Sequence, residues 1–136
     1  MIVIDTHALI WLIEGDRKLG ALAAERINAA RSASSVLIPA VVPWEIGLLT
    51  VRGKIELTFD PLRWIELTLM LPGFSLAPLT PEIAIGSASL EWSHRDPADR
   101  MMVSTAIVHD AMLLTADEKI LAYAAAGHVK VIDARD

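Results

Sequence analysis

The chain contains no cysteine, so it forms neither a disulfide nor a metal site with thiolate ligands, and cysteine-based catalysis is excluded. It also has no excess of positive charge: 12 lysines and arginines stand against 17 aspartates and glutamates, which gives a formal net charge of -5. A broad basic field that could hold nucleic acid non-specifically is therefore missing. Any chemistry on nucleic acid would need local arginines or bridging metal ions.

Long apolar runs are missing as well. The longest stretch without a charged residue runs from Leu67 to Pro81, fifteen residues, and contains three prolines and a glycine. A membrane-spanning helix needs roughly 20 mostly apolar residues, so we predict no membrane span. The chain begins Met-Ile-Val-Ile-Asp, without the basic segment and cleavage site of a secretory signal. We therefore expect a cytoplasmic protein.

Apolar side chains are abundant. They make up 54% of the 136 residues, and the mean hydropathy is +0.46. This length suits a single domain over residues 1–136, with a full hydrophobic core. Because the hydropathy is high for a soluble monomer, we expect additional apolar surface that a partner covers.

Short apolar runs alternate with longer segments of helical periodicity, which predicts an α/β fold with a mainly parallel sheet covered on both faces. The predicted strands are Met1–Ile4, Ser35–Ile38, Phe74–Leu76, Met112–Leu114 and Val129–Ile132. The predicted helices are Thr6–Ile13, Leu19–Ser32, Val42–Arg52, Pro61–Leu71, Pro81–Trp92, Pro97–Asp110 and Glu118–Ala126. In such sheets, ligands bind beyond the carboxyl ends of the strands.

Helix boundaries carry clear local signals. Asp60-Pro61, Thr80-Pro81 and Asp96-Pro97 each place a capping side chain before a proline. A proline at the first helical position loses no hydrogen bond, and the preceding side chain caps a free amide. Gly53 and Gly127 stand where helices are expected to end.

Four carboxylates are expected at the carboxyl edge of the sheet. Asp5 ends the first predicted strand, and Asp117 follows the strand Met112–Leu114. Asp99 lies in the first turn of one predicted helix, and Glu45 lies in the first turn of another, on its apolar stripe. Carboxylates this close stay ionised together only if a cation lies between them. Oxygen ligands without a histidine–cysteine set suit Mg²⁺ or Mn²⁺.

Each carboxylate also has a purely structural interpretation. Asp5 and Asp117 could cap the helices that follow them, and Glu45 could favour a helix dipole. Asp99 stands three residues after Asp96, as the partner residue of a capping box does. The histidines are expected to be polar loop or surface residues rather than ligands, since no second histidine lies at ligand spacing: His7, His94, His109 and His128. The tryptophans fall at apolar positions of predicted helices and suit a core or an interface: Trp11, Trp44, Trp64 and Trp92.

Five segments together resemble the PIN-domain ribonuclease toxins, and more narrowly the VapC toxins of type II toxin–antitoxin systems. They are Ile4-Asp5-Thr6-His7, Pro43-Trp44-Glu45-Ile46, Leu79-Thr80-Pro81-Glu82-Ile83-Ala84, His94-Arg95-Asp96-Pro97-Ala98-Asp99-Arg100 and Leu114-Thr115-Ala116-Asp117. The resemblance covers nearly the whole chain, in order and at the spacing of the family.

The resemblance implies a three-layer α/β/α domain with a parallel sheet of four or five strands. It implies Mg²⁺- or Mn²⁺-dependent cleavage of RNA that leaves a 3′-hydroxyl and a 5′-phosphate. It also implies a homodimer that is neutralised by a small antitoxin with a DNA-binding N-terminus. Matched position by position, the acidic quartet is Asp5, Glu45, Asp99 and Asp117. The supporting residues are Thr6 and Thr115. Asp96 belongs to the signature of the subfamily and is expected to cap its helix; whether it also supports the site stays open.

Two other functions stay open on the sequence. A PIN-like fold could serve as a binding scaffold without catalysis, although no quartet position is substituted. A receiver-type signalling module also clusters acids at strand ends, but it needs an acidic pair where this chain has Asp5-Thr6. RNA binding raises a difficulty of its own, because only Arg95 and Arg100 adjoin the quartet among the basic residues.

Overall fold

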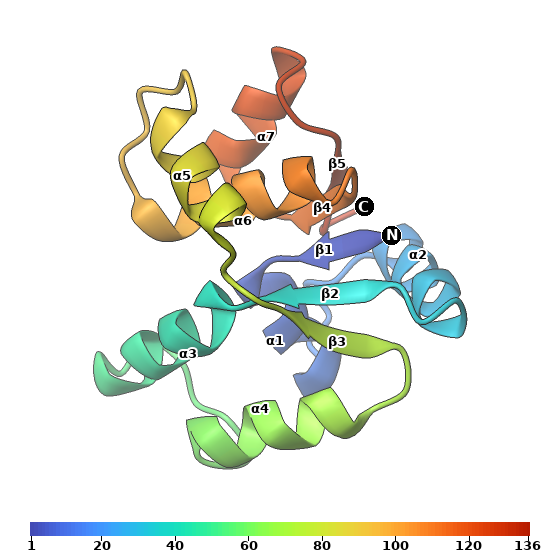
Figure 1. Ribbon diagram of the computed structural model, residues 1–136. Helices are drawn as coiled ribbons and strands as arrows, with labels where there is room; N and C mark the ends of the chain where they lie inside the picture. Colours follow the sequence, from blue (N-terminus) through green and yellow to red (C-terminus); the bar gives the residue numbers. More distant parts are fainter.

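Five parallel strands form one sheet in the order β3-β2-β1-β4-β5 in the computed structural model, which describes residues 1–136 (Figure 1). The strands are β1 (Ile2–Ile4), β2 (Val36–Pro39), β3 (Phe74–Ala77), β4 (Met112–Thr115) and β5 (Val131–Asp133). The helices are α1 (Thr6–Glu14), α2 (Ala21–Ser32), α3 (Val41–Val51), α4 (Pro61–Met70), α5 (Pro81–Ser89), α6 (Pro97–Val108) and α7 (Glu118–Ala125). The prediction of a parallel α/β sheet is confirmed.

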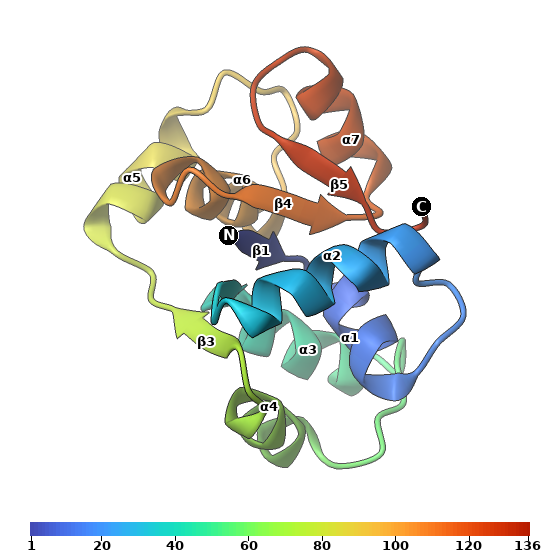
Figure 2. The same ribbon diagram turned by 90° about the vertical axis from the view of Figure 1, so that its right-hand side faces the viewer.

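Helices cover both faces of the sheet. Figure 2 shows α2 in front of the strands and α6 behind them; α2 packs on β2, and α6 packs on β1, β2 and β4. None of the seven helices has the length and apolar character needed to cross a membrane. The sheet is thus the middle one of three layers, which explains why its central strands are continuously apolar.

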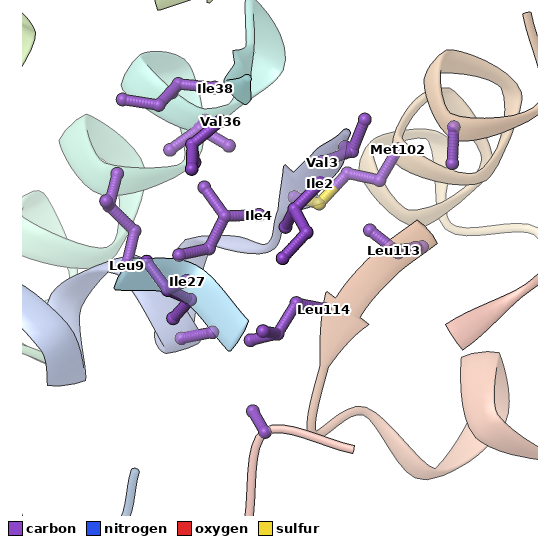
Figure 3. Packing of buried hydrophobic residues seen from close by; sticks show 14 of the residues in the cluster. Ile2, Val3, Ile4, Leu9, Ile27, Val36, Ile38, Met102, Leu113 and Leu114 are labelled. Atoms are coloured by element: carbon purple, nitrogen blue, oxygen red, sulfur yellow. The ribbon is translucent and has the colours of Figure 1, made fainter. Parts of the chain in front are cut away.

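The core consists of alternating strand residues that point into the two helical layers. Val3 and Leu113 lie on the face of the sheet that packs against Met102 of α6. Ile4 and Leu114 lie on the opposite face, toward α1 and α2 (Figure 3). All five side chains are fully buried. The central strands therefore have no face on which a charged side chain could reach water, and polar groups are confined to their ends.

The predicted boundaries agree with the structure to within two residues, with one exception. The helix predicted as Pro81–Trp92 ends at Ser89, so Trp92 lies in the following loop and not on a helix. The three predicted proline starts are confirmed: Asp60 accepts from the Arg63 amide, Thr80 from the Ile83 amide, and Asp96 from the Ala98 amide.

Gly73 lies in the turn between α4 and β3, in close contact with the backbone of Arg31 in α2. Its φ is +92°, and a Cβ placed on it would lie 2.5 Å from the Arg31 Cα and carbonyl oxygen. Arg31 Nε also donates to the Pro72 carbonyl at 3.0 Å, so the end of α2 is held against this turn. Gly127 has the same φ of +92°, but a Cβ there would meet nothing within 4 Å.

We expect Gly73→Ala to destabilise the protein more than Gly127→Ala does. The positive φ alone costs about 1 kcal/mol in each variant. Overpacking against the Arg31 backbone adds roughly 1–3 kcal/mol at Gly73 only. Urea unfolding of both variants measures the difference, and equal losses of stability would contradict the close contact.

Candidate metal centre

A cavity of about 530 Å³ opens at the carboxyl edge of the sheet, and carboxylates from four segments line it. Asp5 lies between β1 and α1, and Asp117 between β4 and α7. Glu45 comes from α3, and Asp99 from α6. The structure thus brings together all four acids that the sequence singled out. The remaining lining residues are His7, Trp11, His94, Asp96, Ala116, Glu118 and Lys119.

Asp5 is held from both sides. Its Oδ1 accepts from the Thr6 amide at 2.6 Å, and its Oδ2 accepts from the Thr115 hydroxyl. The pKa of Asp5 is raised to about 6, mainly by burial; the Thr115 hydrogen bond opposes this shift, and the charge of Glu45 contributes to it. The carboxylate is therefore rigidly placed and costly to ionise without a nearby cation.

Thr115 connects two of the acids. Its hydroxyl donates to Asp5 and accepts from the Asp117 amide at 3.0 Å. Asp117 caps α7 through Oδ1, which accepts from the Lys119 and Ile120 amides. The Thr6 hydroxyl, in contrast, is buried without a hydrogen-bond partner. Of the two threonines, Thr115 supports Asp5 through its hydroxyl and Thr6 through its backbone amide.

Asp99 pairs with His94, although the sequence predicts a polar loop residue there rather than a member of the site. Its Oδ2 lies 2.6 Å from His94 Nε2, and Asp99 is 9% exposed. The pKa of Asp99 is raised to about 7, mainly by burial; the His94 contact opposes this shift, and the charges of Asp117, Asp96 and Asp5 contribute to it. Asp99 takes no part in a reciprocal capping box, because its side chain bonds His94 and no helix amide.

Asp96 caps α6 and also faces the cavity. Its Oδ1 accepts from the Ala98 and Asp99 amides at 2.9 and 3.3 Å. One ligand atom each from His94, Asp96 and Asp99 lies within 4.8 Å of the others. The sequence signal for His94 was weak, since its approach to Asp99 depends on a loop path that no periodicity describes.

Glu45 lies further along its helix than the sequence predicted. Because α3 begins at Val41 rather than Val42, Glu45 is the fifth residue of the helix and lies beyond its first turn. The helix dipole is weak at this position. Its half-buried carboxylate lines the cavity and raises the pKa of Asp5 through its charge.

Arg100 does not face the cavity. Its guanidinium donates to the carbonyls of five residues at the end of α5 and in the loop that follows: Ser87, Ala88, Leu90, Trp92 and His94. These bonds satisfy the free carbonyls that an early helix end leaves, which explains why α5 stops at Ser89. Arg100 thus stabilises the end of α5 and the loop after it. Lys119, which no motif in the sequence indicated, lines the cavity.

The donor set fits a divalent cation. Four carboxylates converge on one cavity, and the pKa values of Asp5 and Asp99 are raised by burial and by the charges of neighbouring carboxylates. Ionised oxygen donors without soft ligands are the chemistry that Mg²⁺ and Mn²⁺ prefer. A cation among them would remove the repulsion that the metal-free site contains.

With this fold and this acidic edge described, comparison with known families assigns the class. The family model of the PIN domain matches residues 2–126. The chain belongs to the PIN domain family, so the family resemblance seen in the sequence is confirmed.

Among individual proteins, the chain is similar to Ribonuclease VapC22 of Mycobacterium tuberculosis, with 26% identity over 120 residues and 88% of each chain covered. It also superposes on a chain of the VapBC2 complex of Rickettsia felis bound to a promoter DNA fragment, with a TM-score of 0.70, 13% identity and 97% and 98% coverage. It also superposes on a chain of VapBC-1 from nontypeable Haemophilus influenzae, with a TM-score of 0.67, 14% identity and full coverage of both chains. At these identities the superpositions establish a shared fold.

We expect Asp99→Asn to stabilise the metal-free protein at neutral pH. A carboxyl whose pKa rises from 3.8 unfolded to about 7 folded contributes stability that is present below pH 4 and is lost as the pH rises to 7. Asparagine carries no charge and keeps the volume and polar contact with His94. The variant should match the wild type near pH 4 and exceed it at pH 8 by on the order of 1–3 kcal/mol.

Urea unfolding in EDTA across this pH range measures the difference. Asp110→Asn is the control, because Asp110 is a surface residue with an 88% exposed side chain, and this substitution should leave the pH dependence unchanged. Lower stability of Asp99→Asn at every pH would contradict repulsion in the site.

Proposed function

We propose that the protein is a metal-dependent RNA endonuclease and acts as the toxin of a type II toxin–antitoxin pair. The convergence of Asp5, Glu45, Asp99 and Asp117 on one cavity is the observation that carries the proposal. The similarity to Ribonuclease VapC22 supports the choice of RNA. The fold shared with chains of VapBC complexes supports the toxin role.

Asp5 and Asp99 would hold the principal Mg²⁺ or Mn²⁺ ion, and Glu45 and Asp117 would complete the site or orient water. When bound, the cation supplies activation of the attacking water and neutralisation of charge on the phosphodiester. The protein supplies position: the Thr115 hydroxyl and the Thr6 amide fix both oxygens of Asp5, and His94 fixes one oxygen of Asp99. Asp96 orients the first turn of α6, which carries Asp99.

Purified protein should cleave structured RNA with Mg²⁺ or Mn²⁺ and lose this activity in EDTA. Asp5→Asn and Asp99→Asn should reduce cleavage at least 100-fold, because each removes one ionised ligand while keeping side-chain volume. Asp110→Asn, with the same change of charge at the surface, should retain full activity. Gel analysis of end-labelled RNA measures the rates and should detect 3′-hydroxyl and 5′-phosphate ends.

Three results would contradict this proposal: cleavage in EDTA, cleavage by Asp99→Asn at the wild-type rate, or no cleavage with any metal. RNA binding without cleavage would instead favour a PIN-fold scaffold. Calorimetric titration with Mn²⁺ provides a second readout, in which wild type binds the ion and Asp99→Asn does not.

A small antitoxin with a DNA-binding N-terminus is the proposed partner in the cytoplasm. The acidic cavity and the net charge of -5 complement a basic C-terminal segment. An antitoxin arginine can bridge two carboxylates with its planar guanidinium and occupy the place of the metal ion. Neutralisation and metal binding would then exclude one another.

The proposed homodimer uses an apolar face beside the cavity. A hollow of about 390 Å³ lies between α3 and α6, lined by Ala40, Val41, Trp44, Leu79, Pro97, Ala98 and Met101. Trp44 is 59% exposed and Leu79 48%. Large apolar side chains gathered in this way on a surface are typical of an interface.

Sedimentation equilibrium at micromolar concentration should give about twice the 14.8 kDa chain mass. Trp44→Glu should shift the protein to a monomer, since a buried unpaired charge at an interface costs several kcal/mol. Leu22→Glu is the control, because Leu22 is 49% exposed on α2, away from this hollow. A monomeric wild type, or a Trp44→Glu dimer, would contradict the assignment.

A further inference from the structure

A second hollow of about 590 Å³ adjoins the acidic cavity. The two share His94 and Lys119, so a ligand can extend from one to the other without leaving the surface. One wall is the loop of residues 92–95, and the other is formed by Lys119, Ala122 and Tyr123 of α7 together with Ala126 directly after this helix. Of the residues that line this aromatic-basic hollow, only His94 belongs to the group that could hold a metal ion.

Aromatic rings form one side of the aromatic-basic hollow. Trp92 stacks on Tyr123 with centroids 4.5 Å apart and an interplanar angle of 17°. Tyr123 in turn stacks on His128 at 4.3 Å and 14°. Trp92 is half-buried, its ring also lies 4.9 Å from the His94 ring at 59°, and the small residues Ala122 and Ala126 line the hollow with it. A flat, apolar group of the size of a nucleobase fits such a wall.

The charge of the aromatic-basic hollow is opposite to that of the cavity. Arg95 and Lys119 are exposed there, no carboxylate lines it, and neither side chain forms an ion pair within 4.0 Å. Arg100, the other cation near in sequence, is occupied by backbone carbonyls. Two free cations beside an apolar wall are suited to a phosphate with an attached base.

We propose that the aromatic-basic hollow is a subsite for one nucleotide of single-stranded RNA next to the phosphodiester that is cleaved. The base packs against Trp92 and Ala122, and its phosphate lies between Arg95 and Lys119. This rests on the proposed function, and it removes the difficulty that the negative charge of the chain raises for RNA binding. Attraction comes from this local pair of cations rather than from a basic field.

The test is to place a negative charge in the aromatic-basic hollow without touching the metal ligands. Ala122→Glu should raise KM for cleavage of a short single-stranded RNA roughly ten-fold, since stacking and phosphate contacts are both lost, and leave kcat within about two-fold. Ala125→Glu is the matched control: it lies on the same helix, is exposed, adds the same charge and does not line the hollow. Thermal melting checks that both variants fold.

Binding in EDTA gives a readout that does not depend on cleavage. Fluorescence anisotropy with a labelled RNA of the same sequence should show roughly ten-fold weaker binding for Lys119→Ala, with a salt dependence reduced by about one unit of slope. Lys54→Ala removes one exposed charge just after the end of α3, outside the lining of the hollow, and should change neither the RNA affinity nor its salt dependence.

The outcomes separate the two proposals. RNA cleavage with an unchanged KM for Ala122→Glu overturns the nucleotide subsite and leaves the nuclease in place. RNA binding that Ala122→Glu and Lys119→Ala both weaken, without cleavage by the wild type, upholds the subsite and overturns the nuclease. If Ala122→Glu and Lys119→Ala leave the RNA affinity unchanged but abolish binding of a glutamate-rich peptide, the nucleotide subsite is overturned and the hollow is a peptide-binding surface.

Discussion

The parallel pairing of β1 with β4 places Asp5 beside Thr115, and the arrangement of the acidic cavity depends on this contact. Both strands lie in the middle of the sheet and are buried on both faces. The first polar side chains along them therefore occur where the strands end. There the Thr115 hydroxyl donates to Asp5 and accepts a hydrogen bond from the amide of Asp117, the residue that caps α7. Two strands, two helix starts and two carboxylates are thus fixed relative to one another by one hydroxyl.

Helix capping and the lining of the acidic cavity use the same carboxylates here. Asp5, Asp96 and Asp117 each accept a backbone amide at the start of a helix, and each also lines the cavity. A carboxylate has two oxygens and about four lone-pair sites, so a cap leaves room for a second partner. The structural and functional interpretations of these residues are therefore compatible. Asp99 differs, because its side chain contacts His94 and no amide of its own helix.

The positive charges near the site are divided between two tasks. Arg100 stabilises the end of α5 and the loop that carries Trp92 and His94. This loop in turn forms one wall of the aromatic-basic hollow and brings His94 to Asp99. Arg95 and Lys119 stay exposed at its surface. A protein of net charge -5 can in this way present a small cationic surface directly beside an acidic one.

The sequence by itself determined the strands and helices, because strands covered on both faces are continuously apolar and the helix starts at Pro61, Pro81 and Pro97 depend on adjacent residues. It also determined that Asp5 and Asp117 share one edge, since the carboxyl ends of parallel strands coincide. Only the tertiary structure decided that His94 reaches Asp99, that Arg100 ends α5 at Ser89, and that Lys119 lies between two hollows. These three facts depend on the path of the loop from Leu90 to Asp96, which has no periodicity and is set by contacts with α6 and α7.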